Sequence, residues 1–79
     1  MNFIKEKIMV LMNQCLDEEG NIDITDELIN IGMNSIRMIK LAVLLEKEFD
    51  IELEDEMPSM DNCKTVSDVI NYVEQKIFD

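Results

Sequence analysis

Residues 35–49 read SIRMIKLAVLLEKEF, and this stretch carries the clearest structural signal in the chain. Its apolar side chains recur at intervals of three or four residues, which is the spacing of one face of an α-helix. The positions that define this face are Ile39, Ala42, Leu45 and Phe49, with Leu41 on its flank. Asn34 comes directly before the stretch, and its side chain suits the N-cap position. The sequence therefore predicts a helix over 35–49 whose apolar face enters a core.

Two further helices are predicted on either side of this stretch. The same spacing predicts a first helix from roughly Asn2 to Leu16 and a last helix from Val66 to Ile77. Thr65 and Asp68 form a capping box at the start of the last helix, with Asp in the position that Glu usually takes.

The segment after residue 49 is irregular and acidic. Pro58 interrupts it, so only a short helix fits there, within Glu54 to Met60. The run Ile22-Asp23-Ile24 alternates like a strand but is too short to seed a sheet. We therefore predict an all-α fold, a small four-helix bundle with three main helices and one short helix.

Length and composition narrow the possible functions. The chain has 79 residues, which predicts a single domain over 1–79 with one small core. Its 18 acidic and 7 basic residues give a net charge of −11, which argues against nucleic acid as a partner. The acidity fits partners with basic surfaces, or it serves only to keep a small protein soluble. Histidine is absent, so no nucleophile–histidine pair is available and we expect no enzyme.

The two cysteines, Cys15 and Cys63, have neither C-x-x-C nor zinc spacing. Cys15 lies on the apolar stripe of the first predicted helix, so a buried free thiol and a cytoplasmic location are expected. The N-terminus lacks the features of a signal peptide, and no stretch has the length of a membrane span. The acids around Gly20 fail the EF-hand spacing, because Cys15 would occupy the first ligand position, and no metal site is predicted.

Ser35 stands where a long polar loop, residues 17–34, gives way to the clearest helix. The apolar residues expected to anchor this loop to the core are Ile22, Ile24, Leu28 and Ile31. Gly32 permits the backbone turn that leaves Ser35 exposed. The first N–H groups of the helix lack partners and the helix dipole adds positive charge, which suits a phosphate on the Ser35 side chain. Asn34 and Ser35 are also common residues at an ordinary helix start.

The pattern Leu28-x-x-Ile31-Gly32-x-Asn34-Ser35-Ile36 resembles the acyl carrier protein and peptidyl carrier protein family. That family usually reads Leu-Gly-x-Asp-Ser-Leu, or a variant that ends in Ser-Ile. Residues 44–53 look like the end of the family's second helix and the loop beyond it, and residues 65–73 look like the start of its fourth. Length, charge and helix order also agree, so the resemblance covers nearly the whole chain.

This resemblance implies a function for Ser35. In the family, a phosphopantetheinyl transferase attaches 4′-phosphopantetheine from coenzyme A to the matching serine, and the terminal thiol carries an acyl, aminoacyl or aryl group as a thioester. The chain is then expected to be a monomeric, non-catalytic carrier of the acyl-carrier-protein type. Its partners would be the transferase, the enzymes that load the arm and the biosynthetic enzymes downstream.

Three features depart from the family's usual pattern. Asn34 stands where the family often has an Asp that contacts a basic residue of the transferase. Arg37 and Lys40 lie just beyond the serine, where fatty-acid carriers usually show acids. The segment between Phe49 and Thr65 is slightly long. These features favour a specialised, free-standing carrier from a nonribosomal-peptide, polyketide or fatty-acid-like pathway. The alternative explanation of Arg37 and Lys40 is drift on a solvated face.

The predicted partner-facing residues surround the serine. Ile36, Met38 and Val43 are apolar and lie partly off the predicted core stripe, so they form a docking patch or pack on the long loop. The full set expected to bind partners is Asn34, Ile36, Arg37, Met38, Lys40 and Val43.

Two other functions stay open at this point. An unmodified acidic helical adaptor would bind a basic partner through the face from Ile36 to Val43, without using Ser35. A D-alanyl carrier for cell-wall polymers would share the chemistry of the arm and differ in its cargo.

Overall fold

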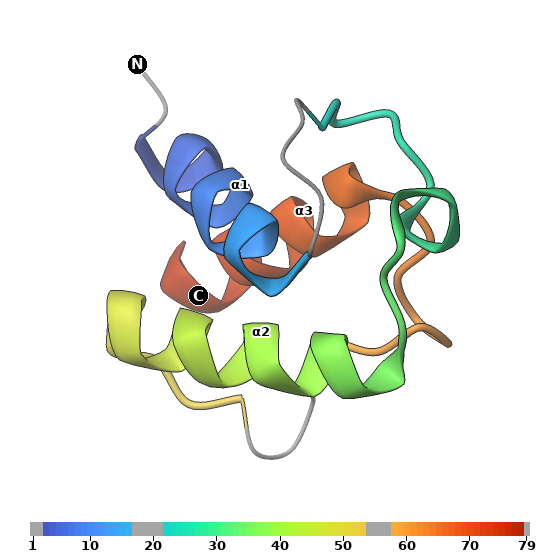
Figure 1. Cartoon of the computed structure of the whole chain (residues 1–79). Coiled ribbons are helices and arrows are strands. Elements are labelled where there is room, and N and C mark those ends of the chain that lie inside the picture. Colours follow the sequence, from blue (N-terminus) through green and yellow to red (C-terminus); the bar gives the residue numbers. More distant parts are fainter. Residues whose placement is uncertain (1–2, 17–21, 54–57, 79) are drawn as a thin grey trace.

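Three α-helices and one short 3-10 helix form the fold (Figure 1). The computed structural model describes residues 3–16, 22–53 and 58–78. The elements are α1 (Phe3–Cys15), η1 (Leu28–Ile31, the 3-10 helix), α2 (Ser35–Phe49) and α3 (Val66–Phe78). These described ranges contain no strand, so the predicted all-α class is confirmed. The three α-helices begin and end within one residue of their predicted bounds.

The apolar core lies where the three α-helices meet. α1 packs against both α2 and α3, and Figure 1 shows α1 and α3 on the same side of α2. No charged or polar residue is buried in the described part of the chain, so burial of apolar surface is the main stabilising contribution. Each α-helix supplies at least two fully buried side chains, among them Ile8, Met12, Leu41, Leu45, Val69 and Val73.

The side of α2 that is buried differs from the side that the spacing predicted, as if the helix were rotated about its axis. Met38 is only 1% exposed, whereas Ile39, predicted to lie in the core, is 57% exposed. The prediction that Met38 lies off the core stripe is therefore wrong, and so is the core placement of Ile39. Both errors have one cause: residues 36–45 are apolar on nearly every side, so periodicity does not single out the buried face. The buried positions are Met38, Leu41, Ala42 and Leu45.

Backbone hydrogen bonds tie residues 22–34 to the start of α3. The Leu28 N–H donates to the Lys64 carbonyl at 2.8 Å, and the Ser67 N–H donates to the Ile24 carbonyl at 2.9 Å. Leu28 is fully buried. The predicted anchoring of this loop is confirmed, because the other anchors are partly buried against the core: Ile22, Ile24 and Ile31. The sequence does not predict η1, since a single 3-10 turn is too short to give a periodic signal.

The short helix predicted within Glu54 to Met60 falls partly on residues 54–57, which lie outside the described residues. The described remainder, 58–60, is not helical. A turn follows instead, in which the Ser59 N–H donates to Asn62 Oδ1 at 2.8 Å and the Cys63 N–H donates to the Ser59 carbonyl at 2.9 Å. In the described chain, the short helical element is η1, and it precedes α2.

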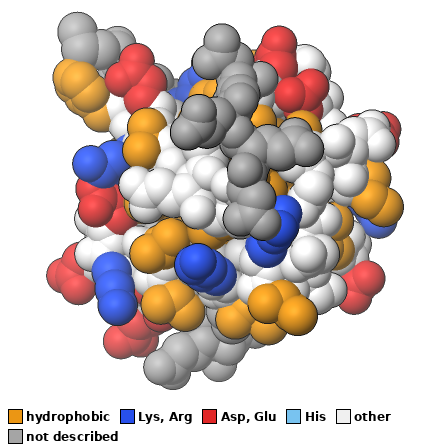
Figure 2. All heavy atoms as spheres, viewed as in Figure 1, with side chains coloured by type: hydrophobic (Ala, Val, Ile, Leu, Met, Phe, Trp, Pro, Cys, Tyr) orange, Lys and Arg blue, Asp and Glu red, His pale blue; other side chains and the backbone are white. Residues whose placement is uncertain are grey.

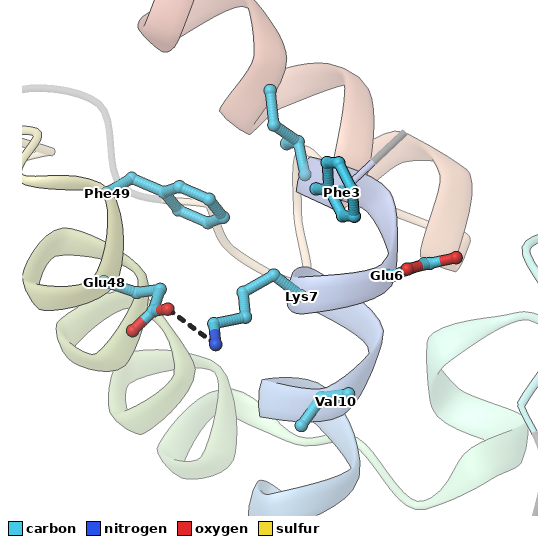
Figure 3. Close-up of a pocket in the computed structure, with 7 residues that line it drawn as sticks. Phe3, Glu6, Lys7, Val10, Glu48 and Phe49 are labelled. Carbon is cyan, nitrogen blue, oxygen red and sulfur yellow. Dashed lines mark ion pairs between the residues drawn. The ribbon is translucent and has the colours of Figure 1, made fainter. Parts of the chain in front are cut away.

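A groove of about 460 Å³ lies between α1 and the C-terminal end of α2 (Figure 3). Apolar side chains line it, including those of Phe3, Val10 and Phe49. Lys7 Nζ and Glu48 Oε1 form an ion pair of 2.9 Å between the two helices. This groove is at the opposite end of α2 from Ser35, so it does not contribute to the site at the start of that helix.

Candidate functional site

Ser35 is the first residue of α2, and its side chain is exposed. The predicted N-cap is confirmed: Asn34 has an extended backbone, with φ −146°, and its Oδ1 accepts a hydrogen bond of 2.9 Å from the Arg37 N–H. The Asn34 carbonyl accepts the first intrahelical bond, from the Met38 N–H at 2.8 Å. The first N–H groups of the helix have no acceptor within it, so they leave partial positive charge next to the serine hydroxyl.

Gly32 turns the chain from η1 into the cap of α2. Its φ of 91° lies in the left-handed region, which favours glycine, and its N–H donates back to the Leu28 carbonyl. The Nη1 of Arg37 donates to the Gly32 carbonyl at 2.9 Å. The predicted turn is therefore confirmed. It is also held by a side chain for which the sequence predicts a partner-binding role.

A small apolar cleft opens beside Ser35. Its volume is about 130 Å³, and it lies between the first turns of α2 and the segment 58–60. The cleft is lined by Ser35, Met38, Ile39, Pro58, Ser59 and Met60. The serine hydroxyl thus lies at the rim of an apolar surface and beside a helix N-terminus.

The structure separates the predicted partner-facing residues by exposure. Asn34, Ile36, Lys40 and Val43 are exposed, with Ile36 at 80%, and Arg37 is half-buried. Met38 is a core residue that reaches the site only as part of the cleft wall. Figure 2 shows the face of the molecule seen in Figure 1, and hydrophobic and basic side chains gather on the part of it that α2 occupies.

Ile39, for which the spacing predicts a core position, is exposed beside the serine. Ile36, Ile39 and Val43 are themselves spaced by three and four residues, as the members of a buried face would be. The same spacing rule that defines a core face also fits this exposed set, and nothing local distinguishes the two faces.

The two cysteines are free and buried, as predicted for Cys15. Burial raises the pKa of both the Cys15 and the Cys63 thiol, so both are protonated at neutral pH and are poor nucleophiles.

Within the described ranges there is no group of three or more residues suited to hold a metal ion. No helix in that part of the chain is long and apolar enough to cross a membrane.

The residues around Ser35 fit a covalently attached phosphodiester. The Ser35 hydroxyl forms no hydrogen bond with another described residue, so modification would break no such bond within the described ranges. The helix N-terminus offers N–H donors and positive potential to phosphate oxygens. Arg37 adds a guanidinium two residues later, and the apolar cleft offers a surface to the portion of an arm closest to the protein.

Comparison with known proteins agrees with this geometry. The family model described as "Phosphopantetheine attachment site" matches residues 6–73. An acyl carrier protein from Exiguobacterium sibiricum is 28% identical over an alignment 79 residues long, and the match covers 92% of this chain and 98% of that protein. An acyl carrier protein from Bdellovibrio bacteriovorus is 38% identical over 47 residues, which cover 60% of this chain and 58% of that protein. No solved structure gives a significant match.

The family assignment rests on the extent of the match. The matched range runs from α1 into α3 and includes Ser35 and the whole of α2. The domain that this family model describes is the site of covalent 4′-phosphopantetheine attachment in carrier proteins. The match covers well over half of the chain, so this protein belongs to the phosphopantetheine-binding family of acyl and peptidyl carrier proteins.

Proposed function

We propose that this protein bears 4′-phosphopantetheine on Ser35 and carries thioester-bound acyl or aminoacyl groups between biosynthetic enzymes. The observation that carries the proposal is the exposed Ser35 hydroxyl at the N-terminus of α2, inside the range matched by the phosphopantetheine attachment family. When bound, the group supplies a terminal thiol that holds cargo as a thioester.

Attachment to Ser35 needs its Oγ to attack the coenzyme A phosphorus that bears the pantetheine. A new P–O bond forms to Ser35, the P–O bond to the nucleotide portion breaks, and the nucleotide leaves. The hydroxyl proton needs a base. No acidic or basic side chain lines the cleft in the described residues, and the chain has no histidine. The base is therefore supplied by the transferase, which fits a protein that catalyses nothing by itself.

The structure also supports a division of roles around the serine. Asn34 and Gly32 fix where α2 begins, and Arg37 holds the preceding turn against the helix. Ile36 and Val43 lie on the exposed surface that an enzyme acting on Ser35 would approach. These residues position and present the serine, and partner enzymes perform the chemistry.

The proposal extends to location and pathway. Two free, buried thiols fit a reducing compartment, so we place the protein in the cytoplasm, where coenzyme A is the donor. The cations Arg37 and Lys40 next to the serine favour a specialised, free-standing carrier over a general fatty-acid carrier. The same cations oppose the adaptor alternative, because a basic partner would meet like charge on the face from Ile36 to Val43.

The test is the intact mass after incubation with coenzyme A and a broad-specificity transferase. The wild-type chain should gain the mass of one phosphopantetheine, and Ser35→Ala should gain none. Ser59→Ala is the matched control, because Ser59 lines the same cleft and should leave the modification unchanged. Modification that persists in Ser35→Ala would refute the assignment of the serine.

Cargo identity needs the protein from its native host. Any further mass on the arm reports the loaded group directly, since a thioester survives purification at mildly acidic pH. D-alanine on the arm would place the protein with carriers for cell-wall polymers. An acyl, aryl or other aminoacyl group would place it in a biosynthetic pathway.

A further inference from the structure

We infer that the outer face of α2 recognises enzymes whose docking surface presents carboxylates around an apolar pocket. This inference rests on the proposed function, because it names the chemistry of the partners that act on Ser35 or on the group attached to it. It concerns five residues on one side of α2, which we call the outer stripe: Ile36, Ile39, Lys40, Val43 and Lys47.

The outer stripe is a continuous surface that faces away from the core. Its members are separated by three, one, three and four residues, so they share one side of the helix. The buried residues of α2 lie on the opposite side, and Leu45 and Met38 are nearly or fully inaccessible. Ile36, Ile39 and Val43 are 80%, 57% and 42% exposed. A helix of a globular domain usually places polar residues on its outward side, so three apolar residues there indicate a binding surface.

From Ser35 to Leu45 the charge of this surface is opposite to that of the rest of the molecule, and Lys47, further along the stripe, is flanked by Glu46 and Glu48. The chain has 18 acidic and 7 basic residues, yet no acid occurs from Ser35 to Leu45, and Glu46 is the first in α2. Lys40 and Lys47 lie within the stripe and are exposed, and Arg37 adds a third cation beside it. A partner with a basic docking surface would meet like charges here, whereas carboxylates on the partner would pair with them.

The outer stripe is also continuous with the attachment site. Ile36 directly follows Ser35, and Ile39 lines the cleft beside the serine hydroxyl. An enzyme that reaches this hydroxyl or a group hanging on it therefore contacts the first turns of the stripe. The apolar side chains supply buried contact area at the centre of such an interface, and the cations select the charge of the partner at its rim.

The experiment uses two versions of one broad-specificity phosphopantetheinyl transferase. One version has a basic carrier-facing surface, and the other has those lysines and arginines replaced by glutamate. The rate of mass gain at Ser35 gives kcat/KM for the wild-type chain and for Lys40→Glu. We expect the glutamate version to prefer the wild-type chain by roughly 3- to 10-fold, and the basic version to prefer Lys40→Glu by a similar factor.

Lys76→Glu is the matched control, because it changes the net charge equally but lies in the last turn of α3. It should leave both preferences unchanged. Equal responses to Lys40→Glu and Lys76→Glu would show that overall charge governs the rates and would overturn the inference. No dependence on either substitution would overturn it as well. If neither transferase version modifies Ser35 in any chain, the proposed function fails instead, which is a separate result.

A second copy of this acidic chain is the other possible occupant of a cationic stripe. Sedimentation of the wild-type chain distinguishes this case. We expect a monomer for both the wild-type chain and Lys40→Glu. A dimer that Lys40→Glu dissociates would assign the outer stripe to self-association and would overturn the inference.

Ile36→Ser tests the apolar contribution of the outer stripe. It should slow both transferase versions while the helical circular dichroism stays unchanged, because Ile36 is 80% exposed.

Discussion

The Nη1 of Arg37 donates a hydrogen bond of 2.9 Å to the carbonyl oxygen of Gly32, five residues earlier. The backbone N–H of the same arginine donates to Asn34 Oδ1, also at 2.9 Å. Ser35 lies between the residues that these two bonds join. The position of its hydroxyl is therefore set by a short local network, even though the side chain itself is free to be modified.

Removing the Arg37 side chain should loosen this network. Arg37→Met keeps much of the side-chain length but loses the bond to the Gly32 carbonyl, so we expect a loss of about 0.5–1.5 kcal/mol in unfolding free energy. Urea unfolding followed by circular dichroism measures it. Arg37→Lys keeps the charge but loses the guanidinium geometry. Its unfolding free energy should therefore lie between those of Arg37→Met and the wild-type chain. Equal stability of Arg37→Met and the wild-type chain would contradict a structural role for this bond.

Gly32→Ala should destabilise the protein through backbone strain. The φ of 91° is unfavourable for a residue with a Cβ, and the expected loss is about 1–2 kcal/mol. A steric clash is not the cause, because an added Cβ would meet Arg37 Nη1 at 3.4 Å, close to ordinary contact distance. Thermal unfolding of Gly32→Ala in the Arg37→Met background distinguishes the causes, since strain predicts that the loss persists without the arginine.

Asn34 offers a direct test of the cap and of transferase choice. Asn34→Ala removes the acceptor of the Arg37 N–H, so we expect a loss of about 0.5–2 kcal/mol in unfolding free energy. Asn34→Asp keeps the acceptor and places a negative charge at the positive end of α2, which should keep or slightly raise stability. Because the family often has Asp here, Asn34→Asp should also be modified faster by a housekeeping transferase. A slower rate in Asn34→Asp would contradict that reading.

Met38 and Ile39 are adjacent in sequence but should respond very differently to truncation. Met38→Ala removes a side chain that is 1% exposed, so we expect a loss of about 2–5 kcal/mol. Ile39→Ala removes a side chain that is 57% exposed and should change stability by less than about 1 kcal/mol. Urea unfolding of the two variants tests the rotation of α2 directly. A larger loss of unfolding free energy for Ile39→Ala than for Met38→Ala would instead support burial of the face that periodicity predicted.

Asp68 should make stability depend on pH. The backbone N–H groups of Lys64 and Thr65 donate to its Oδ2 at 2.9 and 3.1 Å and lower the pKa of this carboxyl. The folded pKa is below the unfolded one, so the carboxylate stabilises the fold at neutral pH, and this contribution is lost as the folded carboxyl takes up its proton.

We therefore expect Asp68→Asn to be less stable than the wild-type chain at neutral pH, with a difference that shrinks as the solution is acidified. Unfolding midpoints measured across the acid range give the result. Asp61→Asn is the matched control, because it removes one exposed carboxylate without removing these bonds. A constant difference for Asp68→Asn at every pH would contradict the linkage.

The parts of the fold that sequence predicts well are those fixed by neighbouring residues. α2 begins and ends at its predicted residues because Asn34 caps it locally, and α3 begins at Val66 because the Thr65 hydroxyl accepts from the Asp68 N–H at 3.2 Å while Asp68 accepts from the Thr65 N–H. Ser35 was identifiable on the same grounds, since its exposure follows from the helix boundary and the glycine turn before it.

The parts that sequence misses depend on contacts between distant residues. η1 is held by the bond from the Leu28 N–H to the Lys64 carbonyl, and no window around Leu28 contains that partner. The rotation of α2 depends on which apolar side meets α1 and the rest of the core, so Met38 and Ile39 exchange roles. The cleft beside the serine brings Met60 against the start of α2, and this proximity also comes only from the fold.

The burial of Cys15 and Cys63 has a practical consequence for following the protein at work. Both cysteines are buried in the folded chain, at 5% and 2% exposure, and burial raises the pKa of each thiol. A thiol-reactive dye added under native conditions should therefore label an arm on Ser35 and leave the polypeptide unlabelled. When aliquots of a loading reaction are labelled at successive times, the fluorescence per molecule counts the arms that are still free, so occupancy can be followed without a radioactive tracer.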